Sequence, residues 1–161
     1  MAVREYLADV AGMVPANECF RYRCIEHFVL ENGRMMKSAP LHPGTPRGVM
    51  KMCYSNSLDR SINDGLPYVE GYAYRPGLIP LPHAWNLNPD GTVSDCTWDD
   101  PEECEYFGVG ISLEYALFMA VRTGTYGVLD NWSERWPLLS GDHGPDMWRD
   151  GSIPADLRNR V

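Results

Sequence analysis

The sequence predicts an α+β fold, in which helices pack on a small antiparallel sheet. Apolar residues recur at helical spacing before residue 64 and again after residue 112. Between residues 66 and 98 the chain instead holds short runs rich in Tyr, Val and Trp, separated by turn sequences. A length of 161 residues suits one domain, 1–161, with its structural core expected at about residues 49–125.

A short helix is predicted over residues 4–13, ending before Pro15. Its apolar face is formed by residues at helical spacing, Tyr6, Leu7, Val10 and Met13. The segment that follows fits the period of a strand as well as that of a helix. The turn signal Asn32-Gly33 favours a β-hairpin across residues 28–36, with a helix ending at Gly33 as the alternative.

Residues 38–48 hold three prolines and two glycines and are predicted to form a loop. This loop leads into a second helix, predicted over residues 50–63 and ended by Gly65. The helix is expected to bury one face, made by Met50, Cys53, Tyr54, Ser57, Leu58 and Ile62.

The sheet is predicted from the middle of the chain. Residues 66–74 are rich in Tyr and Val and form the first expected strand. A proline-rich connector, residues 75–82, separates it from a hairpin. The hairpin strands are residues 83–87 and 92–98, and Asn-Pro-Asp-Gly at 88–91 forms the turn between them.

An acidic loop is expected at residues 99–105. Ser112 is predicted to cap a helix that runs to Arg122, with Leu117, Phe118 and Val121 facing inward. A further short helix is expected at residues 129–139. Residues 140–161, rich in Gly, Asp and Arg, are predicted to form a loosely ordered tail.

The charge of the chain excludes several classes of partner. It carries 14 basic and 22 acidic residues, a net charge of −8, which argues against binding to nucleic acid or to anionic membranes. No apolar run approaches the length of a membrane span, and the first residues carry no signal-peptide pattern. Five cysteines make no even disulfide framework, so we expect a reducing, cytoplasmic location.

No metal site or other cofactor is expected. The cysteines outside the second helix are Cys19, Cys24, Cys96 and Cys104, and none forms a Cys-x-x-Cys pair. A structural zinc site normally needs such paired spacing.

Three residues have the chemistry of a thiol nucleophile and its supporting groups. Cys53 lies near the start of a predicted helix, whose N-terminus favours negative charge. His83 begins a predicted strand, and Asp95 lies on the next strand of the same hairpin. Asp95 can therefore orient the ring of His83, and His83 can act on the thiol of Cys53 as a base.

At these residues the chain resembles the transglutaminase-like branch of the papain-like cysteine protease superfamily. The matching motifs, in chain order, are Cys53 opening a helix, Val69-Glu-Gly-Tyr72, His83-Ala-Trp85, Asp90-Gly91 and Asp95-Cys-Thr97. The resemblance implies that Cys53 is the nucleophile, His83 the general base and acid, and Asp95 the orienting carboxylate. It also implies that the cysteine helix packs on the sheet carrying the other two residues.

The chain departs from the family pattern around the oxyanion hole. Papain-type members use an upstream glutamine there, but this chain contains no glutamine, and Tyr54 stands where the family often has Trp. The backbone N–H of Cys53 can supply one donor. The side chains considered for the second donor are Tyr54, Asn56 and Tyr72.

Three more residues are candidates for substrate contact. Glu70 could bind a substrate cation or polarise Cys53, whereas an exposed strand carboxylate is the more frequent case. Trp85 and Trp98 are expected in the core or the cleft wall, where either could stack on a substrate.

The predicted function is therefore hydrolysis or acyl transfer at an amide, isopeptide or related acyl bond, through a thioester acyl-enzyme. The expected partner is a protein, a peptide or a small amide. The triad does not distinguish water from an amine as the second nucleophile. A non-catalytic binding or inhibitory module that retains the fold is the alternative from another functional class.

Overall fold

A computed structural model of the protein describes residues 3–141, in which an antiparallel sheet of five strands is combined with α-helices. The α+β class is thereby confirmed. The strands are β1 (Arg34–Met36), β2 (Tyr68–Tyr74), β3 (Leu81–Leu87), β4 (Val93–Ser94) and β5 (Glu105–Ile111). The helices are α1 (Val3–Met13), α2 (Ile25–Asn32), α3 (Cys53–Asp64), α4 (Leu113–Thr123) and α5 (Pro137–Ser140).

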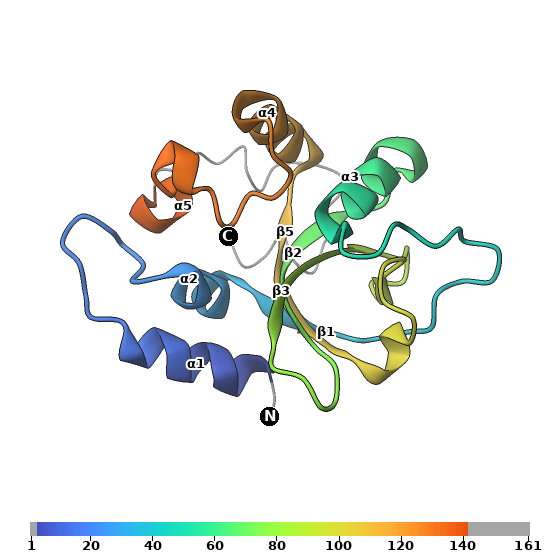
Figure 1. Ribbon diagram of the computed structural model, residues 1–161, viewed down its shortest axis with the longest axis horizontal. Coiled ribbons are helices and arrows are strands. Elements are labelled where there is room, and N and C mark those ends of the chain that lie inside the picture. The colour runs from blue at the N-terminus through green and yellow to red at the C-terminus, as the bar shows by residue number, and fades with distance from the viewer. Residues whose placement is uncertain (1–2, 142–161) are drawn as a thin grey trace.

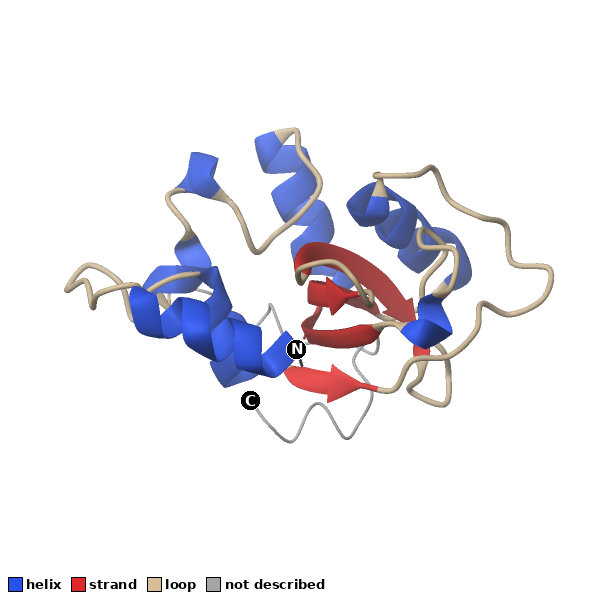
Figure 2. Cartoon of the chain, turned by 60° about the horizontal axis from the view of Figure 1, so that its bottom comes forward, coloured by secondary structure: helices blue, strands red, loops and turns tan. Residues whose placement is uncertain are grey.

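The strand order is β1-β5-β2-β3-β4, and every neighbouring pair is antiparallel. The sheet occupies the centre of the molecule, with α1 and α2 packed together at one end and α3 against β3 at the other (Figure 1). Figure 2 shows the curl of the strands between these helices. None of the described helices is long and apolar enough to cross a membrane.

Side chains alternate between the two faces of the sheet, and both faces of the central strand β2 are buried. On one face Tyr68 and Tyr72 of β2 join the main core beneath the helices. On the other face Val69 and Ala73 join a smaller core that also contains Trp85 of β3. Because both of its faces are buried, β2 is apolar along most of its length, and Glu70 is the one charged residue in it.

The predicted first helix is confirmed as α1, but its exposed and buried residues differ in part from the prediction. Leu7 is buried as expected, together with Val3 and Ala11, whereas Met13 is largely exposed. The predicted hairpin at residues 28–36 is wrong, and the alternative helix is present as α2. Gly33 follows α2 in an extended conformation, and the chain then pairs with β5 instead of folding back.

The second predicted helix begins at Cys53 instead of residue 50, after Lys51 adopts a positive φ of 66°. Met50 is consequently 70% exposed, outside the predicted buried face, and Ile62 is also exposed. Small side chains occupy the contact with the sheet instead. Asn86 of β3 donates to the carbonyl of Ser57 and to the hydroxyl of Ser61, which fixes α3 on the sheet.

The hairpin of the sheet differs from the prediction at both ends. β3 begins two residues earlier, at Leu81, and β4 is much shorter than residues 92–98. The chain bends after Ser94 because the Oδ1 atom of Asp95 accepts the N–H groups of Thr97 and Trp98. Such local side-chain bonding competes with a strand ladder.

Strand β5 was not predicted, although it lies between β1 and β2. Its glycines, Gly108 and Gly110, interrupt the pattern of β-branched and aromatic residues that normally indicates a strand. Gly108 is required by packing, because a Cβ atom there would lie 2.6 Å from both the Glu70 carbonyl and the Trp85 ring. The predicted acidic loop contains a 3-10 helix, Pro101–Glu103, before β5 begins.

Helix α4 has the predicted cap, since the N–H of Tyr115 donates to the Ser112 hydroxyl at 3.0 Å. Its predicted inward face is wrong for Phe118 and Val121, which are 56% and 86% exposed. Ala116 and Met119 are buried instead, so the buried stripe is rotated around the helix axis relative to the prediction.

The predicted helix at residues 129–139 is broken into a 3-10 turn, Trp132–Glu134, and the short α5. Arg135 and Trp136 between them both have positive φ angles, which interrupts a continuous helix. Beyond residue 141, the predicted loosely ordered tail lies outside the described residues.

We expect Gly108→Ala to lower the free energy of unfolding by about 2 kcal/mol, because the added methyl group must displace β2 backbone or the Trp85 ring. Urea denaturation followed by circular dichroism measures this change. Gly12→Ala in α1 is the matched control, because its Cβ meets no atom within 4 Å and alanine favours a helix. Equal stability of the two variants would contradict the packing at Gly108.

Candidate active site

Cys53 is the first residue of α3, and its side chain is nearly buried, with 8% of the residue exposed. No side chain caps this helix end. The N–H groups of the first turn and the helix dipole therefore face the region around the thiol, where both stabilise negative charge. The helix start is a favourable position for a thiolate and for an oxyanion formed beside it.

His83 and Asp95 form a direct buried pair. The Nε2 atom of His83 lies 2.8 Å from the Oδ2 atom of Asp95, and both residues are almost completely buried. His83 belongs to β3, and Asp95 follows β4 directly. The pairing of β3 with β4 is what brings these two segments together.

Asp95 is held as a carboxylate by a full set of donors. Oδ2 also accepts the hydroxyl of Tyr106 at 3.0 Å, and Oδ1 accepts the N–H of Thr97 at 2.7 Å. Burial alone would raise the pKa of Asp95, but the hydrogen bonds from His83, Thr97 and Tyr106 outweigh it and lower the pKa. Asp95 therefore stays charged beside the imidazole.

The pKa of His83 is raised to about 9. Burial acts to lower it, but hydrogen bonds and charge interactions with Asp95 and Cys53 are stronger together. Because Nε2 is bonded to Asp95, Nδ1 is the ring nitrogen left to interact with Cys53. The three predicted residues thus lie together, with His83 between Cys53 and Asp95.

Aromatic rings surround the pair. Trp98 lies over the imidazole with the ring centroids 4.6 Å apart, and the Trp85 ring is stacked at 6.2 Å. Tyr106 of the unpredicted β5 packs against Trp85 and donates to Asp95. These rings exclude water from the His83–Asp95 hydrogen bond, which strengthens it. No sequence motif indicated Tyr106, because its strand was missed.

Asn56 forms hydrogen bonds that hold the loop before α3, and its amide does not face a substrate. Its Nδ2 group donates to the carbonyl of Val49 and to the hydroxyl of Thr97, and its Oδ1 atom accepts the N–H of Val49. Both amide hydrogens are therefore used, and none remains for an oxyanion. The residue still serves the site indirectly, because it ties the approach to Cys53 to the turn that begins at Asp95.

Glu70 is completely buried, which the expectation of an exposed strand carboxylate did not anticipate. It accepts the hydroxyl of Tyr68 at 2.7 Å and the backbone N–H groups of Val128 and Leu129 at 2.8–2.9 Å. Burial raises its pKa, and these hydrogen bonds partly oppose the shift. Glu70 thus fastens the segment after α4 onto β2. Its carboxylate oxygens are engaged by the protein itself.

Tyr54 and Tyr72 differ in what their hydroxyl groups can do. The Tyr72 hydroxyl donates to Glu26 at 2.7 Å, so its proton is already committed. Tyr54, whose ring lies against Gly127, donates to no residue in the described part of the chain. Burial, together with Glu70, Cys53 and Asp130, raises the pKa of Tyr54. Of the three side chains predicted as the second oxyanion donor, only Tyr54 keeps a hydroxyl proton that no described residue accepts.

Trp85 is a core residue. It is completely buried, and its Nε1 atom lies 3.3 Å from the sulfur of Met36. It cannot stack on a substrate without a rearrangement of the smaller core. Its contribution is to pack against the ring of His83. Among residues 3–141 no group of three or more His, Cys, Asp or Glu residues is placed to hold a metal ion.

The His83 pair makes stability depend on pH. Because folding raises the pKa of His83 from about 6.5 to about 9, its stabilising contribution is complete below pH 6.5 and is lost as pH rises through 9. We expect the free energy of unfolding to fall by about 3 kcal/mol more in the wild type than in His83→Asn over this range. Urea denaturation at several pH values measures the difference, and parallel curves would contradict the pairing.

Comparison of the chain with models of known protein families, with curated proteins and with solved structures found no match.

Proposed function

We propose that the protein is a thiol-dependent hydrolase or acyltransferase that acts on amide bonds, with a transglutaminase-like, papain-like arrangement of its site. The observation that carries the proposal is the buried His83–Asp95 pair, 2.8 Å apart, interacting with a cysteine at the first residue of a helix. A core cysteine needs no charged imidazole held by a buried carboxylate. A thiol nucleophile needs such an imidazole, because the positive charge stabilises its thiolate form.

In the first step the Cys53 sulfur attacks the carbonyl carbon of the amide, forming a C–S bond and an oxyanion. The backbone N–H of Cys53 donates to that oxygen, and the Tyr54 hydroxyl is the proposed second donor. The imidazolium of His83 then gives its Nδ1 proton to the leaving nitrogen as the C–N bond breaks. The products are a free amine and a thioester on Cys53.

In the second step a nucleophile removes the acyl group from Cys53. His83, now neutral, takes a proton from water or from an amine as it attacks the thioester carbonyl. The C–S bond breaks, and the imidazolium beside the thiolate is restored. Asp95 retains its charge throughout and keeps Nε2 in the protonated state, so that Nδ1 performs the proton transfers. We favour water as the second nucleophile, because a transferase needs a site that excludes water.

A non-catalytic module is the rival proposal. It is favoured by the low exposure of Cys53, since a thiol that substrates cannot reach would leave the triad without chemistry. The two proposals differ in the reactivity of Cys53 with a small electrophile.

We expect iodoacetamide to modify Cys53 rapidly at pH 6, because the charged His83 stabilises the attacking thiolate. His83→Ala should slow this reaction at least about tenfold, since it removes the positive charge. Mass spectrometry of the digested protein measures the rate at each cysteine separately.

Two other cysteines serve as controls within the same sample. Cys19 is exposed and reports the rate of an accessible thiol, while burial raises the pKa of Cys104 to about 11 and should leave it unmodified. If Cys53 reacts no faster than Cys19 at pH 6, and His83→Ala changes nothing, the binding-module proposal replaces the enzyme.

A further inference from the structure

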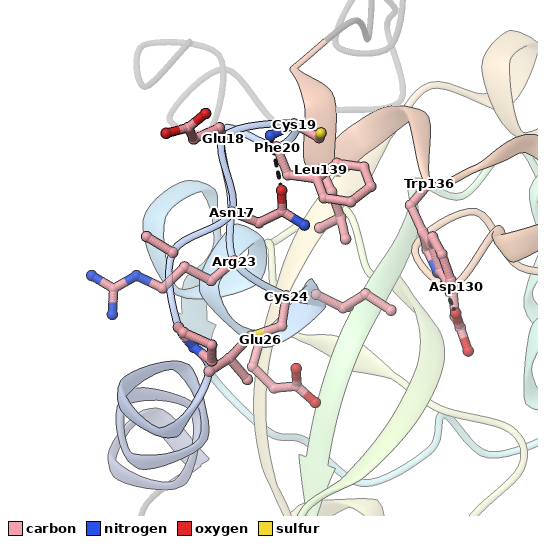
Figure 3. Close-up of a pocket in the computed structure, with 14 residues that line it drawn as sticks. Asn17, Glu18, Cys19, Phe20, Arg23, Cys24, Glu26, Asp130, Trp136 and Leu139 are labelled. Atoms are coloured by element: carbon pink, nitrogen blue, oxygen red, sulfur yellow. Dashed lines mark hydrogen bonds between the residues drawn. The ribbon is translucent and has the colours of Figure 1, made fainter.

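A large cavity, lined by none of the three site residues, has no role in the chemistry proposed above. Its volume is about 780 Å³, within the range of sites that hold small ligands or peptide side chains. It is enclosed by the loop between α1 and α2, the start of α2, and the segment around α5 (Figure 3).

The walls of this cavity are mainly apolar. Phe20 and Ile25 line it from the α2 side, and Trp136 and Leu139 line it from the α5 side. Such walls suit an aliphatic stem, whose burial is favourable, but not a fully hydrated ion.

Three carboxylates line the cavity, namely Glu18, the partly buried Glu26 and the exposed Asp130, and the last two also accept hydrogen bonds from aromatic side chains. Glu26 uses Oε1 to accept the Tyr72 hydroxyl, and Asp130 uses Oδ1 to accept the indole N–H of Trp136. Asp130 therefore keeps its second oxygen without a donor among the described residues, whereas Glu26 also interacts with the thiol of Cys24. In Figure 3 the two side chains approach the cavity from different elements, α2 and the segment before α5.

No basic side chain neutralises these carboxylates within residues 3–141. Arg23 also lines the cavity, but its Nη1 atom donates to the carbonyl of Ala11, and Figure 3 shows its guanidinium directed away from Cys24 and Glu26. Neither Glu26 nor Asp130 forms a salt bridge with a described residue. The cavity therefore combines apolar walls with negative charge.

The cavity adjoins the residues around Cys53. Tyr72, which donates to Glu26, projects from the face of the sheet opposite to His83, so the connection runs instead through Tyr54, whose ring lies against Gly127, three residues before Asp130. Asp130 lies close enough to Tyr54, the neighbour of Cys53, to affect its ionisation together with Cys53. Because Tyr54 directly follows Cys53, a polypeptide held in the cavity can extend along Tyr54 toward the thiol.

We propose that this cavity binds the side chain of a lysine or arginine in a polypeptide substrate, with the stem along the apolar walls and the cation at Glu26 and Asp130. The proposal rests on the proposed function in one respect, that the same polypeptide presents its amide bond to Cys53. An aliphatic stem with a terminal cation matches both features of the cavity, whereas a metal ion would match only the charge.

The test uses the Cys53→Ser protein, which binds without turnover, and three capped tripeptides measured by isothermal titration calorimetry. The first is acetyl-Leu-Lys-Leu-amide. In the other two, norleucine or glutamate replaces the central lysine. We expect the lysine peptide to bind about tenfold more tightly than the norleucine peptide, because only it places a cation at the carboxylates. The glutamate peptide should bind more weakly still, and added salt should reduce the preference.

Matched variants locate the binding. Glu26→Gln and Asp130→Asn should each remove most of the preference for lysine over norleucine while keeping their hydrogen-bond acceptors for Tyr72 and Trp136. Glu114→Gln, on the exposed face of α4, changes the net charge equally and should leave the preference intact. Equal binding of the three peptides, or an equal effect of Glu114→Gln, would overturn the proposal.

The affinity for free butylamine tests whether the cavity takes the cation from a polypeptide or from a small amine. Tighter binding of butylamine than of the lysine peptide would also overturn the proposal. The binding measurement is independent of catalysis. If the lysine preference is present but Cys53 of the wild type is unreactive toward iodoacetamide, the cavity is a peptide-binding site and the enzymatic proposal alone fails.

Discussion

The hydrogen bond between His83 and Asp95 is the constraint on which the rest of the site depends. A buried imidazole would normally lose its charge, and a buried carboxylate would normally be protonated. Here each residue stabilises the charged form of the other. The hydroxyl of Tyr106 and the N–H of Thr97 donate further hydrogen bonds to Asp95. The cost of burying these charges is therefore offset locally, and a charged histidine can be kept beside Cys53.

Several features of the fold serve to hold this pair in place. The short β4 ends where Asp95 begins to accept backbone N–H groups, so the bend after Ser94 and the orientation of the carboxylate have one cause. Gly108 allows the Trp85 ring to lie close to β5, and that ring stacks behind His83. On the opposite face of β2, Glu70 fastens the segment after α4, whose Gly127 supports Tyr54.

The sequence was sufficient to predict the α+β class, the helix at Cys53 and the triad candidates, because these depend on local patterns and on short spacings. It was not sufficient for β5, since two glycines hide a strand whose existence depends on packing against β2 and Trp85. Glu70 shows a similar limit. A carboxylate on a strand is usually exposed, and the N–H groups that make its burial possible come from Val128 and Leu129, 58 and 59 residues away.

The most direct test of the account is the ionisation of His83 itself, followed by nuclear magnetic resonance of protein labelled in its histidines. The His83 signals are assigned by their loss in His83→Asn. We predict that the ring stays charged up to a pKa of about 9 and that Asp95→Asn lowers this value markedly. A His83 that titrates near pH 6.5, unaffected by Asp95→Asn, would contradict the charged pair and with it the thiol chemistry derived from it.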